Sequence, residues 1–155
     1  MQPHLKKVFE NIHLIEFNYK KLITAMFSAE KEKVDFVAEV DPNDKNVEDW
    51  MNEVEEMMRE SIKYELKNSV DKYPETKRTA WTCNHPGQCI LNGSQIWWTT
   101  LVEESIHAHN IRDYFALSTS QLNDLVELVR QPLTKQQQVT INALIVIDVH
   151  AKDVV

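Results

Sequence analysis

The longest regular pattern of apolar positions lies at residues 47–73 and stops at Pro74. Apolar side chains recur there at intervals of three and four residues, which places them on one face of an α-helix. They are Val47, Trp50, Met51, Val54, Met57, Met58, Ile62, Leu66, Val70 and Tyr73. The pattern predicts one long helix, in which Trp50, Val54 and Ile62 are buried together.

Residues 22–40 follow a different period, because apolar and polar positions alternate in two runs, as in half-buried β-strands. The apolar positions are Ile23, Ala25 and Phe27 in the first run and Val34, Phe36, Ala38 and Val40 in the second. Charged residues 30–33 separate the runs, so we predict a β-hairpin. A turn-forming cluster at residues 41–46 then separates the hairpin from the long helix.

Helical patterns flank these two elements. Upstream, the spacing of Leu5, Val8, Phe9 and Ile12 predicts a helix that begins at Pro3 and ends near Glu16. Downstream, residues 73–87 are expected to be irregular. Helices are predicted at residues 88–109 and 111–130, the second with Phe115 and Leu122 on its inner face.

The last element begins near Thr134. Its β-branched residues would also suit a buried strand, but its length and its polar lead at residues 135–138 favour a helix. The predicted fold is therefore mainly α, with one small β-hairpin near residues 22–40. Within one unit of 155 residues, residues 1–45 form a helix plus the hairpin and residues 46–155 a helical bundle. The final apolar run has no capping signal, so we expect the polypeptide to continue past Val155.

Composition excludes several classes of function. The chain has two glycines, so no glycine-rich phosphate loop can be written and no nucleotide site is expected. A formal net charge of -7 argues against a nucleic-acid partner, and the basic pairs, Lys77-Arg78 included, are interpreted as solvated surface. No apolar run approaches the roughly 18 residues of a membrane span. Two cysteines are too few for a disulfide scaffold, which indicates a reducing compartment.

Candidate chemistry is sparse. Cys83, His85 and Cys89, with His107 and His109 downstream, are residue types that bind zinc, but their spacing fits no zinc module. A structural loop is the preferred interpretation, and no metal site is predicted. Asp148 and His150 lie two residues apart, so on a helix they point in different directions and cannot form a base and its orienting group. We therefore predict no catalytic residues and no cofactor-binding residues.

Five residues are the candidates for interaction with other elements: Trp97, Trp98, Asp148, His150 and Asp153. Adjacent tryptophans on a helix lie about 100° apart, so we expect one in the core and the other against a neighbouring layer. The aspartates are interpreted as polar contacts, and a buried carboxylate would need Arg, Lys or backbone donors. The acidic side of the long helix either docks a partner or is simply solvated.

Several motifs, taken in order, closely resemble the linker region of dynein heavy chains, most of all the axonemal kind. They are QPHLKKVFENI, ITAMFSAE, VEDWMNEVEEMM, YPETKRTAW, HPGQ, SQIWWT, SQLNDLVELVR and ALIVIDVHAKDVV. The resemblance is weak over residues 2–45 and strong over residues 47–155. Departures are His85, Gln131-Pro132 and Lys31, which stands where the family has a glycine. Lys31 leaves open whether a tight turn with positive φ or a looser turn closes the hairpin.

The resemblance implies a non-catalytic mechanical linker that arches over a ring of AAA+ modules and changes its bend as the first module turns over ATP. Its partners would be that ring and the remaining linker helices, with microtubules and other dynein subunits reached through the parent chain. ATP and magnesium would bind in the AAA+ modules, not here. The implied location is the cytoplasm and cytoskeleton, in a ciliary or flagellar axoneme.

Two other functions stay open at the level of sequence. One is a stand-alone helical adaptor that binds proteins through its acidic helix or its tryptophan pair. The other, weaker one is a metal-dependent enzyme that uses the Cys and His loop. A reading frame that continues past Val155 into a P-loop module would favour the motor.

Overall fold

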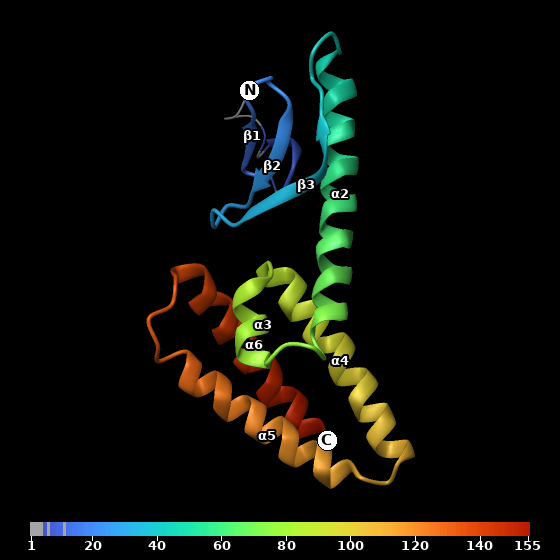
Figure 1. Cartoon of the computed structure of the whole chain (residues 1–155), viewed down its shortest axis with the longest axis vertical. Coiled ribbons are helices and arrows are strands. Elements are labelled where there is room, and N and C mark those ends of the chain that lie inside the picture. The colour runs from blue at the N-terminus through green and yellow to red at the C-terminus, as the bar shows by residue number, and fades with distance from the viewer. Residues whose placement is uncertain (1–4, 6, 11) are drawn as a thin grey trace. The chain divides into compact units, whose positions relative to one another are not determined.

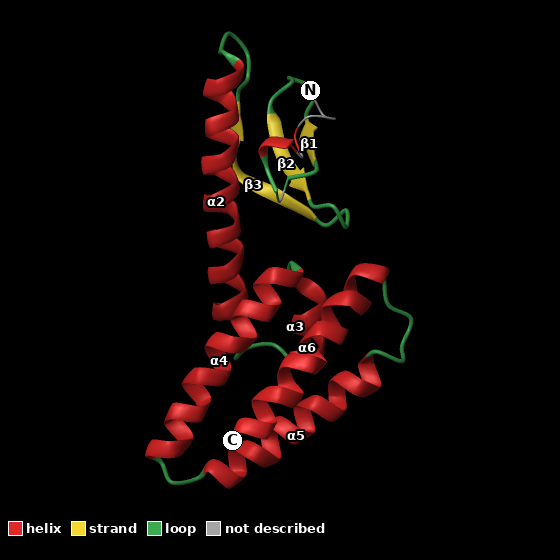
Figure 2. Cartoon of the chain, turned by 180° about the vertical axis from the view of Figure 1, so that it is seen from behind, coloured by secondary structure: helices red, strands yellow, loops and turns green. Residues whose placement is uncertain are grey.

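The computed structural model describes residues 5, 7–10 and 12–155. Helices account for most of these residues and the strands form one small sheet, which confirms the predicted mainly α fold (Figures 1 and 2). The elements are β1 (Leu14–Phe17), β2 (Ile23–Phe27), β3 (Lys33–Val40), α2 (Val47–Lys72), α3 (Arg78–Asn84), α4 (Gly87–His107), α5 (Ile111–Leu128) and α6 (Lys135–Val154). The chain divides into two compact units, Met1–Glu65 and Leu66–Val155, with the boundary inside α2.

The first unit contains an antiparallel sheet in the order β1-β2-β3, so the predicted hairpin at residues 22–40 is present. Its core joins apolar side chains of the strands to the first turns of α2. Trp50 is 4% exposed and Val54 is fully buried, while Ile62 is half-buried against the same cluster. A side-chain contact also fixes β3 to α2, because the Ser61 hydroxyl accepts a hydrogen bond from the Val37 amide at 3.1 Å.

The prediction that the first helix extends to Glu16 is wrong, because residues 14–17 form β1. Residues 5, 7 and 8 are helical, and Pro3 lies outside the described residues. Ile15 pairs with Met26 of β2, and both side chains are buried in the core of the sheet. Antiparallel pairing with the next strand along the chain therefore overrides the local helical spacing.

The hairpin turn is tight although it lacks the family's glycine. Lys31 adopts a φ of 66°, a left-handed conformation that costs a non-glycine residue roughly 1 to 2 kcal/mol. Hydrogen bonds from the Lys31 amide to the Ser28 carbonyl, at 3.0 Å, and from the Ser28 amide to the Glu32 carbonyl, at 2.9 Å, offset that cost. The turn is therefore the tight one with positive φ, at Lys31.

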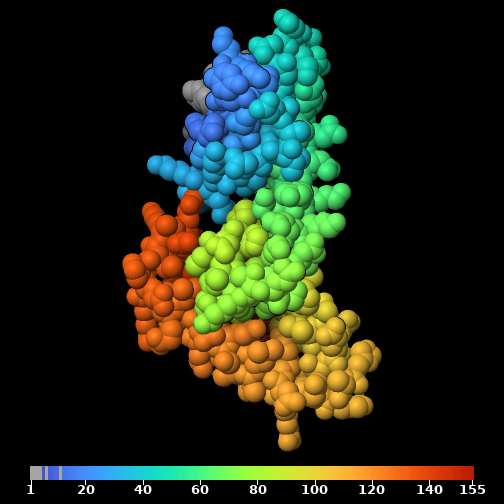
Figure 3. Space-filling model, viewed as in Figure 1, coloured from blue at the N-terminus to red at the C-terminus, as the bar shows by residue number. Residues whose placement is uncertain are grey.

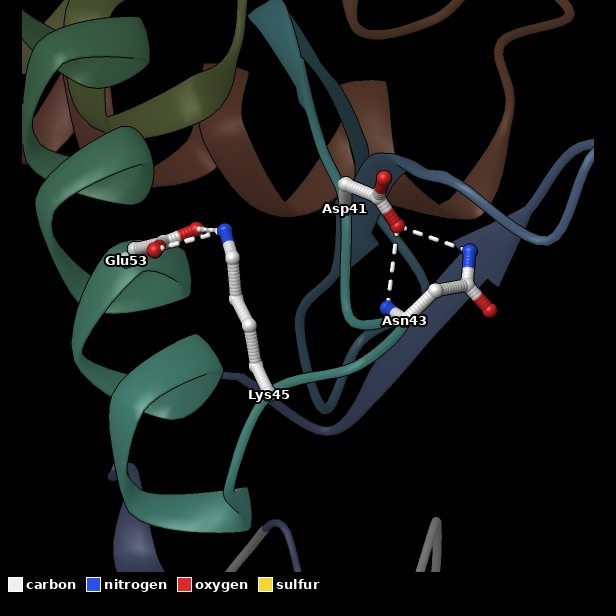
Figure 4. Close-up of polar contacts among 4 residues, drawn as sticks. All are labelled: Asp41, Asn43, Lys45 and Glu53. Carbon is white, nitrogen blue, oxygen red and sulfur yellow. Dashed lines mark hydrogen bonds and ion pairs between the residues drawn. The ribbon is translucent and has the colours of Figure 1, made fainter.

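Side chains also shape the connection from β3 to α2 (Figure 4). The Asp41 carboxylate accepts hydrogen bonds from the backbone amide of Asn43, at 2.9 Å, and from its side-chain amide, at 2.7 Å. Lys45 reaches along the start of α2 to Glu53, with an Nζ to Oε2 distance of 2.6 Å. These contacts close the turn locally, as the cluster of Asp, Asn and Pro residues predicts.

The second unit is built of helices around a small apolar core. Residues 73–87 are not irregular throughout as predicted, because Arg78–Asn84 form α3. A seven-residue helix without a side-chain cap is too short to show a helical period in the sequence. It supplies the fully buried Trp81, which packs with Ile90, Leu125 and Leu144. The space-filling view shows α5, in orange, lying against α3, in yellow-green (Figure 3).

Gly93 of α4 allows this core to close. A Cβ atom added to Gly93 would lie 3.2 Å from Cζ2 of Trp81 and 3.4 Å from the Ser69 hydroxyl oxygen. The indole Nε1 of Trp81 donates to the Ser69 carbonyl at 2.7 Å, which fixes the position of the ring. Glycine at position 93 therefore permits a close approach of α4 to Trp81, and it is not required by a positive φ.

Helices α5 and α6 complete the bundle. The inner face of α5 carries the buried Tyr114 and Leu125. Phe115 is 43% exposed, so its predicted inward position is wrong, and Leu122 is half-buried. One residue of rotation, about 100°, separates the predicted face from the observed one.

The predicted helix from Thr134 is confirmed, and a capping box starts it. The Thr134 hydroxyl accepts a hydrogen bond from the backbone amide of Gln137 at 3.2 Å. In return, the side-chain oxygen of Gln137 accepts one from the backbone amide of Thr134 at 3.0 Å. This reciprocal pair favours a helix over a strand. Among the described residues, no helix combines the length and hydrophobicity that crossing a membrane requires.

Burial in the first unit generates a stability prediction. We expect Trp50→Ala to lower the free energy of unfolding by about 3 to 5 kcal/mol, because it leaves a large cavity in the core. Glu56→Gln, at an exposed position of the same helix, is expected to change it by less than about 0.5 kcal/mol. Urea unfolding measures both values, and equal small effects would show that the buried face of α2 is misassigned.

Candidate functional site

A buried ion pair between α3 and α6 is the most strongly organised polar feature of the second unit. Arg78 Nη1 lies 2.6 Å from Asp148 Oδ2, and Arg78 Nη2 lies 2.9 Å from Asp148 Oδ1. The two side chains are 11% and 14% exposed. Nη2 also donates to the hydroxyl of Ser94 on α4 at 3.0 Å. One guanidinium therefore joins three helices, in the bidentate geometry that Arg forms best with a carboxylate.

Side chains from these helices, from α5 and from Tyr73, which follows α2, surround the ion pair. Together they line a cavity of about 20 Å³ formed by Tyr73, Arg78, Ser94, Trp98, Leu101, Tyr114, Ser118, Gln121, Asp148, Ala151 and Lys152. Pockets that bind small molecules usually measure about 300 to 1,000 Å³. The cavity is therefore far too small for a substrate, and it is comparable with the space that one water molecule needs.

Burial controls the ionisation of this site. It raises the pKa of Tyr73, and the nearby charge of Arg78 only partly opposes that effect. Burial likewise raises the pKa of Tyr114 to about 12, with a further contribution from Tyr73. Burial alone would lower the pKa of Arg78, but the hydrogen bonds and charge of Asp148 raise it. At neutral pH the site thus holds one paired cation beside two protonated phenols.

Aromatic rings pack beside the ion pair. Tyr73 meets Trp81 edge to face at 4.9 Å between ring centroids, and it stacks on Trp97 at 5.3 Å. The indole Nε1 of Trp97 donates to the Val70 carbonyl at 2.9 Å. Trp97 connects the end of α2 to α4, and both tryptophans of the adjacent pair are half-buried. The prediction that one of them lies in the core is wrong, because Trp81 occupies that place.

The other residues predicted to interact fall into two groups. Trp98 and Asp148 both line the cavity, and Asp148 has the buried cationic partner that a carboxylate in such a place requires. His150 and Asp153 lie on the exposed side of α6. The structure therefore brings Trp98 and Asp148 together and leaves His150 and Asp153 at the surface.

Arg78 is the site residue that sequence reasoning missed. Its place beside Lys77 predicts a solvated surface, yet its side chain is only 11% exposed. The sequence does contain a signal, because a carboxylate within the apolar run ALIVIDV calls for a buried cation elsewhere in the chain. The sequence does not identify which cation it is, since Arg78 and Asp148 are 70 residues apart.

The cysteine and histidine loop does not form a metal centre within the part of the chain that the structure describes. No group of three or more His, Cys, Asp or Glu side chains is placed there to hold a metal ion. Cys89 is buried in the second unit and Cys83 is half-buried, and no disulfide joins them. The prediction of a loop is wrong for the cysteines, because Cys83 lies in α3 and Cys89 in α4. The Cys83 carbonyl is 3.5 Å from the side-chain amide of Gln137, so the end of α3 contacts the start of α6.

Comparison with known proteins places these features in a family. The family described as "Dynein heavy chain, N-terminal region 2" matches residues 1–69. The whole chain is 45% identical over 156 residues to dynein axonemal heavy chain 1 of Homo sapiens. It is 42% identical over 159 residues to dynein axonemal heavy chain 12 of Mus musculus, and 40% over 157 residues to dynein axonemal heavy chain 3 of Mus musculus. The chain spans 4% to 5% of the length of these relatives.

The buried ion pair generates a second prediction. Asp148→Asn is expected to lower the free energy of unfolding by about 3 to 5 kcal/mol, because it leaves the buried Arg78 charge without its partner. Glu127→Gln is the matched control, since it breaks the Arg130–Glu127 pair, whose side chains are 68% and 69% exposed. That change should cost less than about 1 kcal/mol. Denaturant unfolding at pH 7 compares them, and similar losses would contradict the assigned burial.

The phenol of Tyr114 generates a prediction about pH. The unfolded chain releases this proton near the ordinary pKa of 10.0, whereas the folded chain keeps it until about 12. Stability should therefore fall as pH rises from about 10 to about 12, since the folded state then binds more protons than the unfolded state. Between these pH values, the free energy of unfolding of Tyr114→Phe should fall by about 1 to 2 kcal/mol less than that of the unsubstituted protein. Parallel alkaline unfolding curves for the two proteins would rule out the raised pKa.

Proposed function

Because this chain belongs to the dynein heavy chain family, we propose that it serves as a mechanical linker segment of a microtubule motor. In this role it couples ATP-driven changes in an AAA+ ring to movement. The similar proteins are named as axonemal heavy chains, which supports a cytoskeletal location in the axoneme. The chain covers a small part of those proteins, so the motor activity belongs to the longer heavy chain.

The Arg78–Asp148 ion pair is the observation that carries this proposal. A segment that transmits displacement must resist deformation, and a buried bidentate pair resists the separation of the helices it joins. Arg78 lies in the motif YPETKRTAW and Asp148 in ALIVIDVHAKDVV, two of the motifs that carry the resemblance. The ion pair therefore supports a role in which α6 moves together with α3 and α4.

In this role the segment itself carries out no chemistry. ATP and magnesium belong to AAA+ modules elsewhere in the heavy chain, and residues 1–155 supply stiffness and contact surface. The size of the cavity around Arg78 supports this division, because about 20 Å³ cannot admit a nucleotide.

The proposed partners are the AAA+ ring and the remaining linker helices of the same heavy chain. Three valines on α6 support a contact surface there, since Val139, Val146 and Val149 are 57%, 58% and 40% exposed. Their spacing places them on one side of the helix. Microtubules and other dynein subunits are reached through the rest of the heavy chain.

A softened linker tests the mechanical role. In an intact heavy chain, Ile145→Ala removes packing from the cluster around Trp81 and Leu144 and should weaken this unit by about 2 kcal/mol. We expect microtubule gliding velocity to fall by a larger factor than the ATPase rate, because ring chemistry continues while the transmitting element becomes compliant. Gliding assays and ATPase measurements on the same preparations check this.

Gln138→Ala is the matched control, at an exposed position of the same helix, and it should leave both rates unchanged. Equal losses of velocity and ATPase rate for Ile145→Ala would indicate a general folding defect. Unchanged velocity in a variant with proven loss of stability would refute the mechanical role.

A further inference from the structure

Two buried nitrogen atoms beside the Arg78–Asp148 pair have no acceptor among the residues that the structure describes. They are Nε of Arg78 and Nε1 of Trp98. Both are N–H donors, and about 90% or more of buried donors in natural proteins have a hydrogen-bond partner. The remaining nitrogens of Arg78 are engaged, Nη1 with Asp148 and Nη2 with Asp148 and Ser94. What this part of the site needs is therefore an acceptor.

The two donors belong to side chains that line the same cavity, whose volume is about 20 Å³. A water molecule needs roughly 10 to 15 Å³ of such space and two to four polar partners. The lining also carries side-chain oxygens on Tyr114, Ser118 and Gln121, which are able to accept the protons of a water molecule. The cavity thus offers donors and acceptors in the number that one water uses.

We infer that this cavity is a site for one structural water molecule, whose oxygen accepts from Arg78 Nε and Trp98 Nε1. The water links α3 to α4 beside the direct bond from Arg78 to Ser94. By accepting a hydrogen bond from Nε of Arg78, it keeps Nη1 and Nη2 oriented toward Asp148. Its role is to position Arg78, and through Arg78 it acts on the contact between α3 and α6.

A halide ion could also accept hydrogen bonds from these two N–H groups, but the observations favour water. The charge of Arg78 is already balanced by Asp148 at 2.6 Å, so that cation offers an anion little net attraction. Lys152 also lines the cavity, but its ammonium lies 5.0 Å from the centroid of the Phe115 ring, which attracts it. A neutral ligand that both donates and accepts therefore fits this site better than an anion.

A direct test observes the water in the unmodified chain of residues 1–155. Nuclear magnetic resonance should show a cross-peak between the Trp98 indole proton and water, with the sign of a long-lived water molecule. A crystal structure should show one water-sized density peak within hydrogen-bond distance of both nitrogens. No cross-peak together with an empty cavity would overturn the inference, and so would an anomalous signal at this position after a bromide soak.

A second test removes each indole donor at nearly constant ring size. Trp98→benzothienylalanine replaces the N–H by sulfur, and Trp97→benzothienylalanine is the matched control, because Trp97 donates to the Val70 carbonyl at 2.9 Å. If water accepts from Trp98, both changes should raise the unfolding equilibrium constant by about fivefold, the typical value of one hydrogen bond. The contradicting result is an unfolding equilibrium constant that rises for the Trp97 variant but falls or stays unchanged for the Trp98 variant. That result would show that the Trp98 donor has no partner.

Discussion

The second unit depends on a charge pair that water cannot easily reach. Arg78 and Asp148 are each about a tenth exposed, so pulling them apart would leave two poorly solvated charges. Helix α3 has seven residues, too few to be stable by itself. Its place in the bundle therefore rests on Arg78 at one end and on the buried Trp81 within it. The raised pKa values of Tyr73 and Tyr114 are a further effect of the same burial.

Patterns that repeat along the sequence predict most of the fold. Helix α2 and the β2–β3 hairpin each carry many turns or alternations of one period, so local spacing determines their type. The last helix is ambiguous by period alone; its length and its polar lead favour a helix, and the capping box at Thr134 and Gln137 agrees with that prediction. These elements could be predicted because neighbouring residues contain the relevant information.

The features that sequence reasoning missed depend on contacts that a helical or strand period does not encode. Strand β1 pairs through Ile15 with Met26 of the next strand, whereas the tryptophan of α3 is buried among residues of three later helices. Within the site, Asp148 and Trp98 are candidates from sequence, but Arg78 is not. An arginine beside a lysine is expected to be exposed, and only the fold shows that it is buried against a carboxylate. Contacts at long sequence separation leave no periodic trace, so spacing could not reveal them.

The close approach between Gly93 and Trp81 has an evolutionary consequence. With 3.2 Å between an added Cβ atom and the indole, alanine at position 93 requires the ring of Trp81 to shift by a few tenths of an ångström. The Ser69 hydroxyl oxygen stands 3.4 Å from that same Cβ position, close to an ordinary van der Waals contact, so the ring of Trp81 is the tighter neighbour. Substitution at either position should then be accompanied by substitution at the other. Among homologous chains, residues 81 and 93 are expected to vary as a correlated pair, with larger residues at 93 appearing only where the ring at 81 is smaller.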